Sequence, residues 1–135
     1  MGLFDLFRRR QNQDADYRLY GAIVDQARLP AFYSNCGVPD TVNGRFDLIG
    51  LHAYLVMRCL KGMANERGTG LSQRLFDIMF TDMDRNLREM GVGDLSVGKK
   101  VKAMAKAFYG RVKADDEGLA GGPEALEDAL RRNLF

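Results

Sequence analysis

The sequence has few of the residues that metal and catalytic sites need. It contains one histidine, His52, and two cysteines, Cys36 and Cys59. A structural zinc site takes about four nitrogen or sulfur ligands, so these side chains are too few. Both cysteines have apolar neighbours, which predicts buried free thiols rather than a disulfide. His52 and Cys59 lie about 10 Å apart along one predicted helix and cannot form a dyad. We expect no enzyme, cofactor or metal.

Long apolar runs and alternating strand patterns are also absent. The most apolar stretch, 46–60, is too short to span a bilayer and includes Asp47 and Arg58, which predicts a buried core helix. A composition of 46% hydrophobic and 28% charged residues is typical of one soluble globular domain. Helical spacing of apolar residues elsewhere predicts an all-α fold, with five or six helices packed around the 46–60 helix.

Local signals place the ends of these helices. Asp14 or Asp16 is expected to cap the first helix, and Ser96 a later one. An Asn-Gly turn is expected at 43–44. The acidic run 115–117 favours a helix end there, although Leu119 could continue the helix. The predicted helices cover residues 14–28, 46–61, 71–90, 97–113 and 123–134, with a short helical turn after Pro30 and a flexible connection over 62–70.

The first ten residues, MGLFDLFRRR, place apolar side chains before three arginines. A secretory signal has the opposite order. Two interpretations stay open: a terminal turn packed on the body, or an interfacial anchor whose apolar side enters the headgroup layer while the arginines bind anionic lipid. We separate an N-terminal segment, 1–13, expected to be flexible, from a helical domain, 14–135. The membrane-contact candidates are Leu3, Phe4, Phe7, Arg8, Arg9 and Arg10.

The stretch 82–111 contains two amphipathic helices around a glycine-rich turn. Asp82 and Asp84 point about 200° apart on a helix, so they do not converge on one metal ion. Ion pairs of Asp82 with Arg85, of Asp84 with Arg88 and of Arg85 with Glu89 explain them better. The second helix is basic, and its face is either solvated or a contact for phosphate, lipid headgroups or an acidic protein. Its basic residues are Lys99, Lys100, Lys102, Lys106, Arg111 and Lys113.

Four methionines follow the same two helices. Met79, Met83, Met90 and Met104 fall on helix faces near the turn. Core filling is the ordinary role of such residues, whereas methionine also suits deformable sites that accept varied apolar segments. A net charge of +2 and the lack of interleaved aromatic residues disfavour a nucleic-acid binder.

Two stretches together suggest a family. They are YGAIVDQARLPAFYSNCGVPDTVNGRFDLIGLHAYLVMRCL and LSQRLFDIMFTDMDRNLREMGVGDLSVGKKVKAMAKAFYGR. The chain resembles the ubiquinol–cytochrome c chaperone family over about 17–118, most specifically over 80–111. The resemblance implies a non-enzymatic, all-helical chaperone that binds newly made cytochrome b and supports assembly of the cytochrome bc1 complex. Mitochondrial members also work with a small partner protein and associate with the ribosome.

The short N-terminal segment is typical of a bacterial member, expected in the cytoplasm or at the inner membrane; a eukaryotic member would be mitochondrial. We expect no specific DNA and no small-molecule substrate. The alternatives are a peripheral membrane adaptor, a ribosome-associated binding module and a small enzyme whose site the sequence does not reveal. A groove between the two helices of 82–111 is expected to hold the client. Its candidate binding residues are Asp82, Met83, Asp84, Arg88, Met90, Lys99, Lys100, Lys102, Met104, Phe108, Tyr109 and Arg111.

Overall fold

Six helices make up the part of the chain that the structure describes. The computed structural model describes residues 3–62 and 66–133, and for 4–13, 66–69 and 133 it describes the backbone only. No strand occurs within these ranges, so the all-α prediction is confirmed. The helices are α1 (Leu3–Ala27), α2 (Pro30–Ser34), α3 (Val42–Gly62), α4 (Glu66–Glu89), α5 (Asp94–Gly121) and α6 (Pro123–Asn133).

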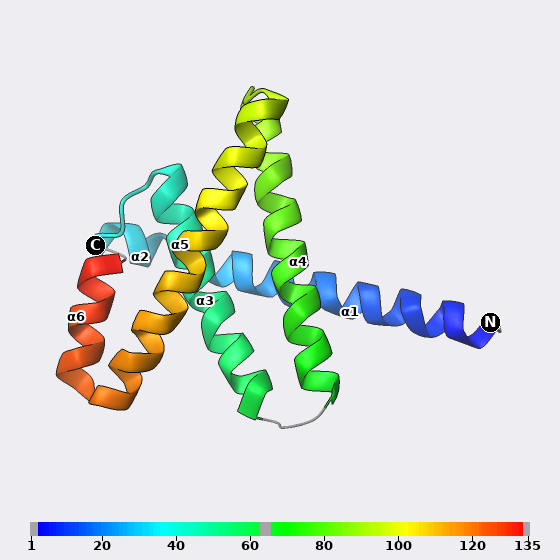
Figure 1. Ribbon diagram of the computed structural model, residues 1–135, viewed down its shortest axis with the longest axis horizontal. Coiled ribbons are helices and arrows are strands. Elements are labelled where there is room, and N and C mark those ends of the chain that lie inside the picture. Colours follow the sequence, from blue (N-terminus) through cyan, green and yellow to red (C-terminus); the bar gives the residue numbers. More distant parts are fainter. Residues whose placement is uncertain (1–2, 63–65, 134–135) are drawn as a thin grey trace.

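The helix α3 occupies the central place that was predicted for 46–60. It contacts α1, α4 and α5, whereas α6 packs mainly along the end of α5. Figure 1 shows α4 and α5 as a hairpin whose tip projects from the body, and α1 crossing the bundle with its N-terminal end extending beyond it. The shared core sits where α1, α3, α4 and α5 meet.

The core is built from the apolar faces that the helical spacing predicted. Leu48, Leu75, Met79 and Val97 are fully buried. Aromatic rings pack edge to face around them, since Phe80 lies 5.9 Å from Phe46 and 6.0 Å from Phe108 between ring centroids. One face of α4 is buried at Leu75, Met79, Met83 and Leu87, and we name this face the α4 stripe. Met90 follows the last residue of the helix and is 61% exposed.

The first helix differs from its prediction in start and in face. It begins at Leu3, so neither Asp14 nor Asp16 caps it. Asp16 is instead buried, and its Oδ2 accepts a 2.6 Å hydrogen bond from Nε of Arg74 on α4. Tyr17 is exposed. The buried positions of this helix are Asp16, Tyr20, Ile23 and Ala27, at steps of four, three and four residues, so Asp16 lies on the face that packs inward.

Residues 43–44 lie inside α3 rather than in a turn. Oγ1 of Thr41 accepts a 3.0 Å hydrogen bond from the backbone N–H of Gly44, which is the geometry of a threonine N-cap. A Cβ at Gly44 would lie 1.9 Å from the carbonyl oxygen of Pro39. The glycine is therefore needed for a close backbone approach, which a turn prediction from Asn-Gly misses.

The turn between α4 and α5 has the geometry of a Schellman motif. Gly91 has φ of +90°, its N–H donates to the carbonyl of Arg88 at 3.0 Å, and the N–H of Val92 donates to Leu87 at 3.1 Å. The helix predicted to end at residue 90 ends at Glu89, within one residue of the expected position. The predicted cap at Ser96 is wrong, because α5 begins at Asp94 with Gly93 as its N-cap.

Three further predictions are corrected. The acidic run 115–117 lies inside α5, which continues to Gly121. Asp115 is buried, and Asp116 accepts hydrogen bonds from α3, so neither carboxylate lies at a solvated helix end. The helix α4 begins at Glu66, within the expected 62–70 connection. Cys36 and Cys59 are free as expected, but both are exposed rather than buried.

Candidate functional site

A groove of about 920 Å³ opens between α2, the start of α3, the end of α4 and the middle of α5. Its apolar lining is contributed by all four helices, and charged side chains of both signs stand around it. We name it the methionine groove, because it holds three of the seven methionines. The apolar lining is Pro30, Tyr33, Val42, Phe46, Ile49, Met83, Leu87, Met90 and Met104; the polar lining is Arg28, Ser34, Asp40, Arg45, Asn86 and Glu89.

Helical spacing explains how α4 lines this groove. Met83, Leu87 and Met90 recur at steps of four and three residues and therefore share one face. Met83 and Leu87 are buried, while Met90 stands beyond the end of the helix where no neighbour covers it. An unbranched thioether with three rotatable bonds adapts to irregular apolar shapes. The α4 side of the groove is thus deformable.

The charged lining is only weakly constrained. Nε of Arg45 lies 2.7 Å from Oδ1 of Asp40, and both side chains are mostly exposed. The hydrogen bond from Arg45 to Asp40 raises the pKa of the guanidinium. Exposed pairs of this kind contribute little stability, so they separate easily when a partner binds.

Only some predicted site residues reach the groove. Met83, Met90 and Met104 line it, whereas Asp82, Asp84 and Arg88 do not. Two of the three predicted ion pairs are confirmed: Arg85 binds Asp82 at 3.0 Å, and Arg88 binds Asp84 at 2.6 Å. Among the described residues, the predicted pair of Arg85 with Glu89 does not form, because Arg85 turns to Asp82. Arg88 also pairs with Asp94 across the turn. As partner-binding residues, the charged members of this group stay predictions.

The basic residues of α5 divide into two groups. Lys99, Lys100 and Lys102 are exposed, as are Lys106 and Lys113. Arg111, expected beside them, turns inward: its Nη2 lies 2.5 Å from Oδ1 of Asp47, and its guanidinium lies 5.9 Å from the centre of the Phe46 ring. The basic face therefore consists of lysines alone.

The two aromatic candidates have different surroundings. Phe108 is buried in the core, so it cannot serve as an exposed anchor. Tyr109 is mostly exposed, and its ring centroid lies 5.5 Å from that of Phe76.

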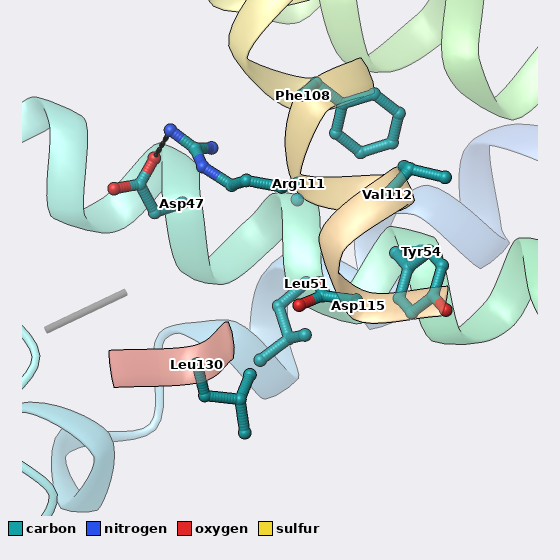
Figure 2. Close-up of a pocket in the computed structure, with 9 residues that line it drawn as sticks. Asp47, Leu51, Tyr54, Phe108, Arg111, Val112, Asp115 and Leu130 are labelled. Atoms are coloured by element: carbon teal, nitrogen blue, oxygen red, sulfur yellow. Dashed lines mark ion pairs between the residues drawn. The ribbon is translucent and has the colours of Figure 1, made fainter. Parts of the chain in front are cut away.

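A small buried polar cluster lies between α3, α5 and α6 (Figure 2). Asp47, Arg111 and Asp115 surround a cavity of about 10 Å³, close to the volume that one water molecule requires. Burial raises the pKa of both Asp47 and Asp115, while the Arg111 guanidinium opposes this rise. Nη1 of Arg111 and Oδ1 of Asp115 are buried and have no hydrogen-bond partner among the described residues. The cavity is too small to admit a substrate.

The neighbouring carboxylate, Asp116, is also held by residues of α3. Oδ1 of Asp116 accepts hydrogen bonds from the Tyr54 hydroxyl at 2.5 Å and from Nη1 of Arg58 at 2.7 Å. Burial, with the Asp116 hydrogen bond, raises the pKa of Tyr54 to about 12. This triad ties α5 to α3 and has no arrangement typical of catalysis.

The single histidine has a structural environment. Nδ1 of His52 lies 2.8 Å from the Leu48 carbonyl, and its ring packs edge-on against Phe32. Within residues 3–62 and 66–133, no group of three or more His, Cys, Asp or Glu side chains is placed to hold a metal ion. No helix over the same residues has the length and hydropathy to cross a bilayer.

Sequence reasoning missed the half of the groove that lies outside 82–111. Arg28, Pro30 and Tyr33 come from the end of α1 and from α2, and Val42 and Arg45 from the start of α3. Pro30, Tyr33 and Val42 are apolar residues between the first predicted helix and the predicted 46–60 helix. They carried a usable signal, because apolar residues kept at the surface outside the core helices often line a binding site.

Comparisons with known proteins agree over most of the chain. A family model described as Ubiquinol-cytochrome C chaperone matches residues 34–135. The Ubiquinol-cytochrome-c reductase complex assembly factor 1 of Xenopus laevis is 28% identical over 123 residues, covering 90% of this chain and 60% of the frog protein. Its mouse counterpart is 30% identical over 123 residues, covering 90% of this chain and 41% of the mouse protein. This chain therefore spans less than two thirds of either relative.

A solved structure shares the fold. The crystal structure of the Cbp3 homolog from Brucella abortus has a TM-score of 0.82 and 41% sequence identity, and the match covers 98% of this chain and 74% of that one.

Proposed function

The chain belongs to the ubiquinol–cytochrome C chaperone family, and from that premise we propose that it is a non-enzymatic assembly chaperone for the cytochrome bc1 complex. Its client is newly made cytochrome b, and its place is the cytoplasm next to a bacterial inner membrane. The names of the frog and mouse relatives, assembly factors of ubiquinol-cytochrome-c reductase, support this role. Contact with a ribosome, with a small partner protein or with lipid through residues 3–10 stays a prediction.

The methionine groove is the observation that carries the proposal. Its volume of about 920 Å³ lies near the upper end of the roughly 300–1,000 Å³ range of ligand pockets. Such a groove receives several side chains of one apolar helix, which is how amphipathic-helix grooves hold their ligands. A transmembrane segment of cytochrome b supplies an apolar helix that needs cover until it enters the bilayer.

The lining chemistry fits a transient client better than a permanent subunit. The apolar side chains of Phe46, Ile49 and Met83 lie beneath exposed charges of both signs. An apolar centre within a polar rim is the usual anatomy of a non-obligate interface. Met90 and Met104 provide adaptable contacts that accept more than one apolar sequence.

Photo-crosslinking during synthesis of the client tests the proposal directly. A photoreactive amino acid replaces Met90, which lines the groove, and in a matched protein it replaces Leu55, an exposed leucine of α3 outside it. Cytochrome b is translated in vitro with either protein present. We expect cytochrome b adducts from position 90 and few from position 55, and no adducts at 90 with a water-soluble protein as client.

A pair of substitutions gives the second arm. Met90→Lys places a charge in the groove, and Leu55→Lys makes the same change elsewhere on the surface. We expect Met90→Lys to lower client capture about tenfold, since it removes an apolar contact worth about 1–2 kcal/mol, and Leu55→Lys to leave capture unchanged. Equal capture by both variants would exclude the groove as the client site. Absence of cytochrome b from every adduct would exclude the function.

A further inference from the structure

A second surface on α5 is independent of the methionine groove. Six large side chains recur along this helix at steps of four, three, four, three and four residues, which places them on one face. Every one of them is exposed. We name this face the lysine stripe; it consists of Leu95, Lys99, Lys102, Lys106, Tyr109 and Lys113.

The charge of the stripe is not neutralised by the protein. None of its four lysines forms an ion pair with any residue that the structure describes. No acidic residue occurs in α5 between Asp94 and Asp115. Asp94 itself pairs with Arg88, so it does not face the stripe as a free charge. Four positive charges therefore lie on one straight helix face within about 21 Å, the rise over fourteen residues.

Two apolar side chains lie along this charged face, Leu95 at its start and Tyr109 between Lys106 and Lys113. Leu95 is 90% exposed, and Tyr109 is mostly exposed with its ring beside Phe76. In Figure 1 the Leu95 end lies near the projecting tip of the α4–α5 hairpin. A single exposed leucine is ordinary on a protein surface, but this one shares a helix face with four unpaired lysines, and that combination fits a surface that is both anionic and apolar.

We propose that the lysine stripe docks α5 lengthwise on a bilayer surface that carries anionic headgroups. The lysines bind the headgroups, and Leu95 and the Tyr109 ring enter the interfacial layer, where aliphatic and tyrosine side chains are favoured. A basic surface for RNA needs phosphate contacts and stacking rings, but it has no use for an exposed leucine. The exposed Leu95 therefore favours lipid over RNA.

The expected strength of membrane binding follows from the number of lysines. Each lysine near an anionic membrane surface strengthens binding about fivefold, so removing three lowers it about a hundredfold. Leu95 adds a smaller factor of about tenfold through burial of its side chain. The lysine stripe lies outside the methionine groove, so its vesicle binding can be measured without cytochrome b.

The test uses the full chain and vesicles of phosphatidylcholine with or without phosphatidylglycerol. Binding is measured by flotation. We expect binding only to the anionic vesicles, and a loss of about a hundredfold on changing Lys99, Lys102 and Lys106 to glutamine. The matched control changes Arg18, Lys61 and Arg132 to glutamine; it alters net charge equally on other helices, where all three side chains are exposed.

Further variants separate this surface from other binding modes. Leu95→Gln is expected to weaken vesicle binding about tenfold and to leave binding of a single-stranded RNA oligonucleotide unchanged. An equal loss of vesicle binding in the control triple variant would show that binding depends only on net charge, and it would overturn the proposal. Lysine-dependent RNA binding with vesicle binding insensitive to Leu95→Gln would overturn it too. So would vesicle binding that is lost only when Leu3, Phe4 and Phe7 are changed to glutamine.

Discussion

Replacing Arg111 by methionine tests the buried cluster of Figure 2. The substitution keeps the apolar stem of the side chain and removes the guanidinium that lies 2.5 Å from Asp47. Asp115, only 4% exposed, loses the same cation. Breaking a buried pair by removing one partner costs about 3–5 kcal/mol. Because Asp47 retains some exposure, we expect about 3 kcal/mol at pH 7, which lowers the melting temperature by about 10 °C.

The loss of stability caused by Arg111→Met should also depend on pH, in a direction that the carboxyl groups determine. Burial raises the pKa of Asp47 and Asp115 above the ordinary value of 3.8. A carboxyl group whose pKa is higher in the folded than in the unfolded protein stabilises the fold at low pH, and this stability is lost as the pH rises through the folded pKa. Without Arg111 both pKa values rise further. The destabilisation caused by Arg111→Met should therefore shrink as the pH falls and the two carboxyl groups take up protons.

Urea unfolding followed by far-ultraviolet circular dichroism measures these changes at pH 7 and near pH 4. A variant that combines Arg111→Met with Asp47→Asn and Asp115→Asn serves as the control, because it removes both uncompensated charges and should regain most of the lost stability. A loss below about 1 kcal/mol at pH 7, the size of an exposed ion pair, would refute the reasoning. So would a loss of equal size at both pH values.

Three further substitutions test single features. Gly44→Ala should cost about 3 kcal/mol in urea unfolding, since its Cβ would meet the Pro39 carbonyl oxygen at 1.9 Å; an unchanged midpoint would contradict that contact. Gly110→Ala, the matched helical glycine with no atom within 4 Å of the added Cβ, should stabilise by up to ~1 kcal/mol, and a loss would refute the open space there. Arg74→Met should cost about 2–3 kcal/mol, because it leaves Asp16 buried without its partner. A thermal midpoint within 2–3 °C of the unchanged protein would count against it.

Features fixed by local chemistry were predictable from the sequence. The α4 stripe through Leu75, Met79 and Met83 follows from helical periodicity, and all three residues are buried. Gly91 was predictable because a helix end in this geometry needs positive φ. The ion pair of Asp84 with Arg88 needed only the four-residue spacing. Each signal lies within a few residues of the feature that it predicts.

Features that depend on distant partners were not predictable. Asp16 resembles a helix cap until its partner Arg74, 58 residues away, is known. Arg111 resembles a member of the lysine face until Asp47 is brought beside it. The methionine groove needs α2 and the start of α3 as well as 82–111, and no periodic pattern states which distant segment closes a groove.

The continuity of α5 has a mechanical consequence. Its 28 residues form one rod of about 42 Å. Two anchors on adjacent turns, Arg111 to Asp47 and Asp116 to Tyr54 and Arg58, hold the rod against α3 and prevent it from spinning about its axis. Near the hairpin tip, the fully buried Val97 holds the other end of the same rod. The direction in which Lys99 and Lys102 point is therefore fixed from both ends of α5.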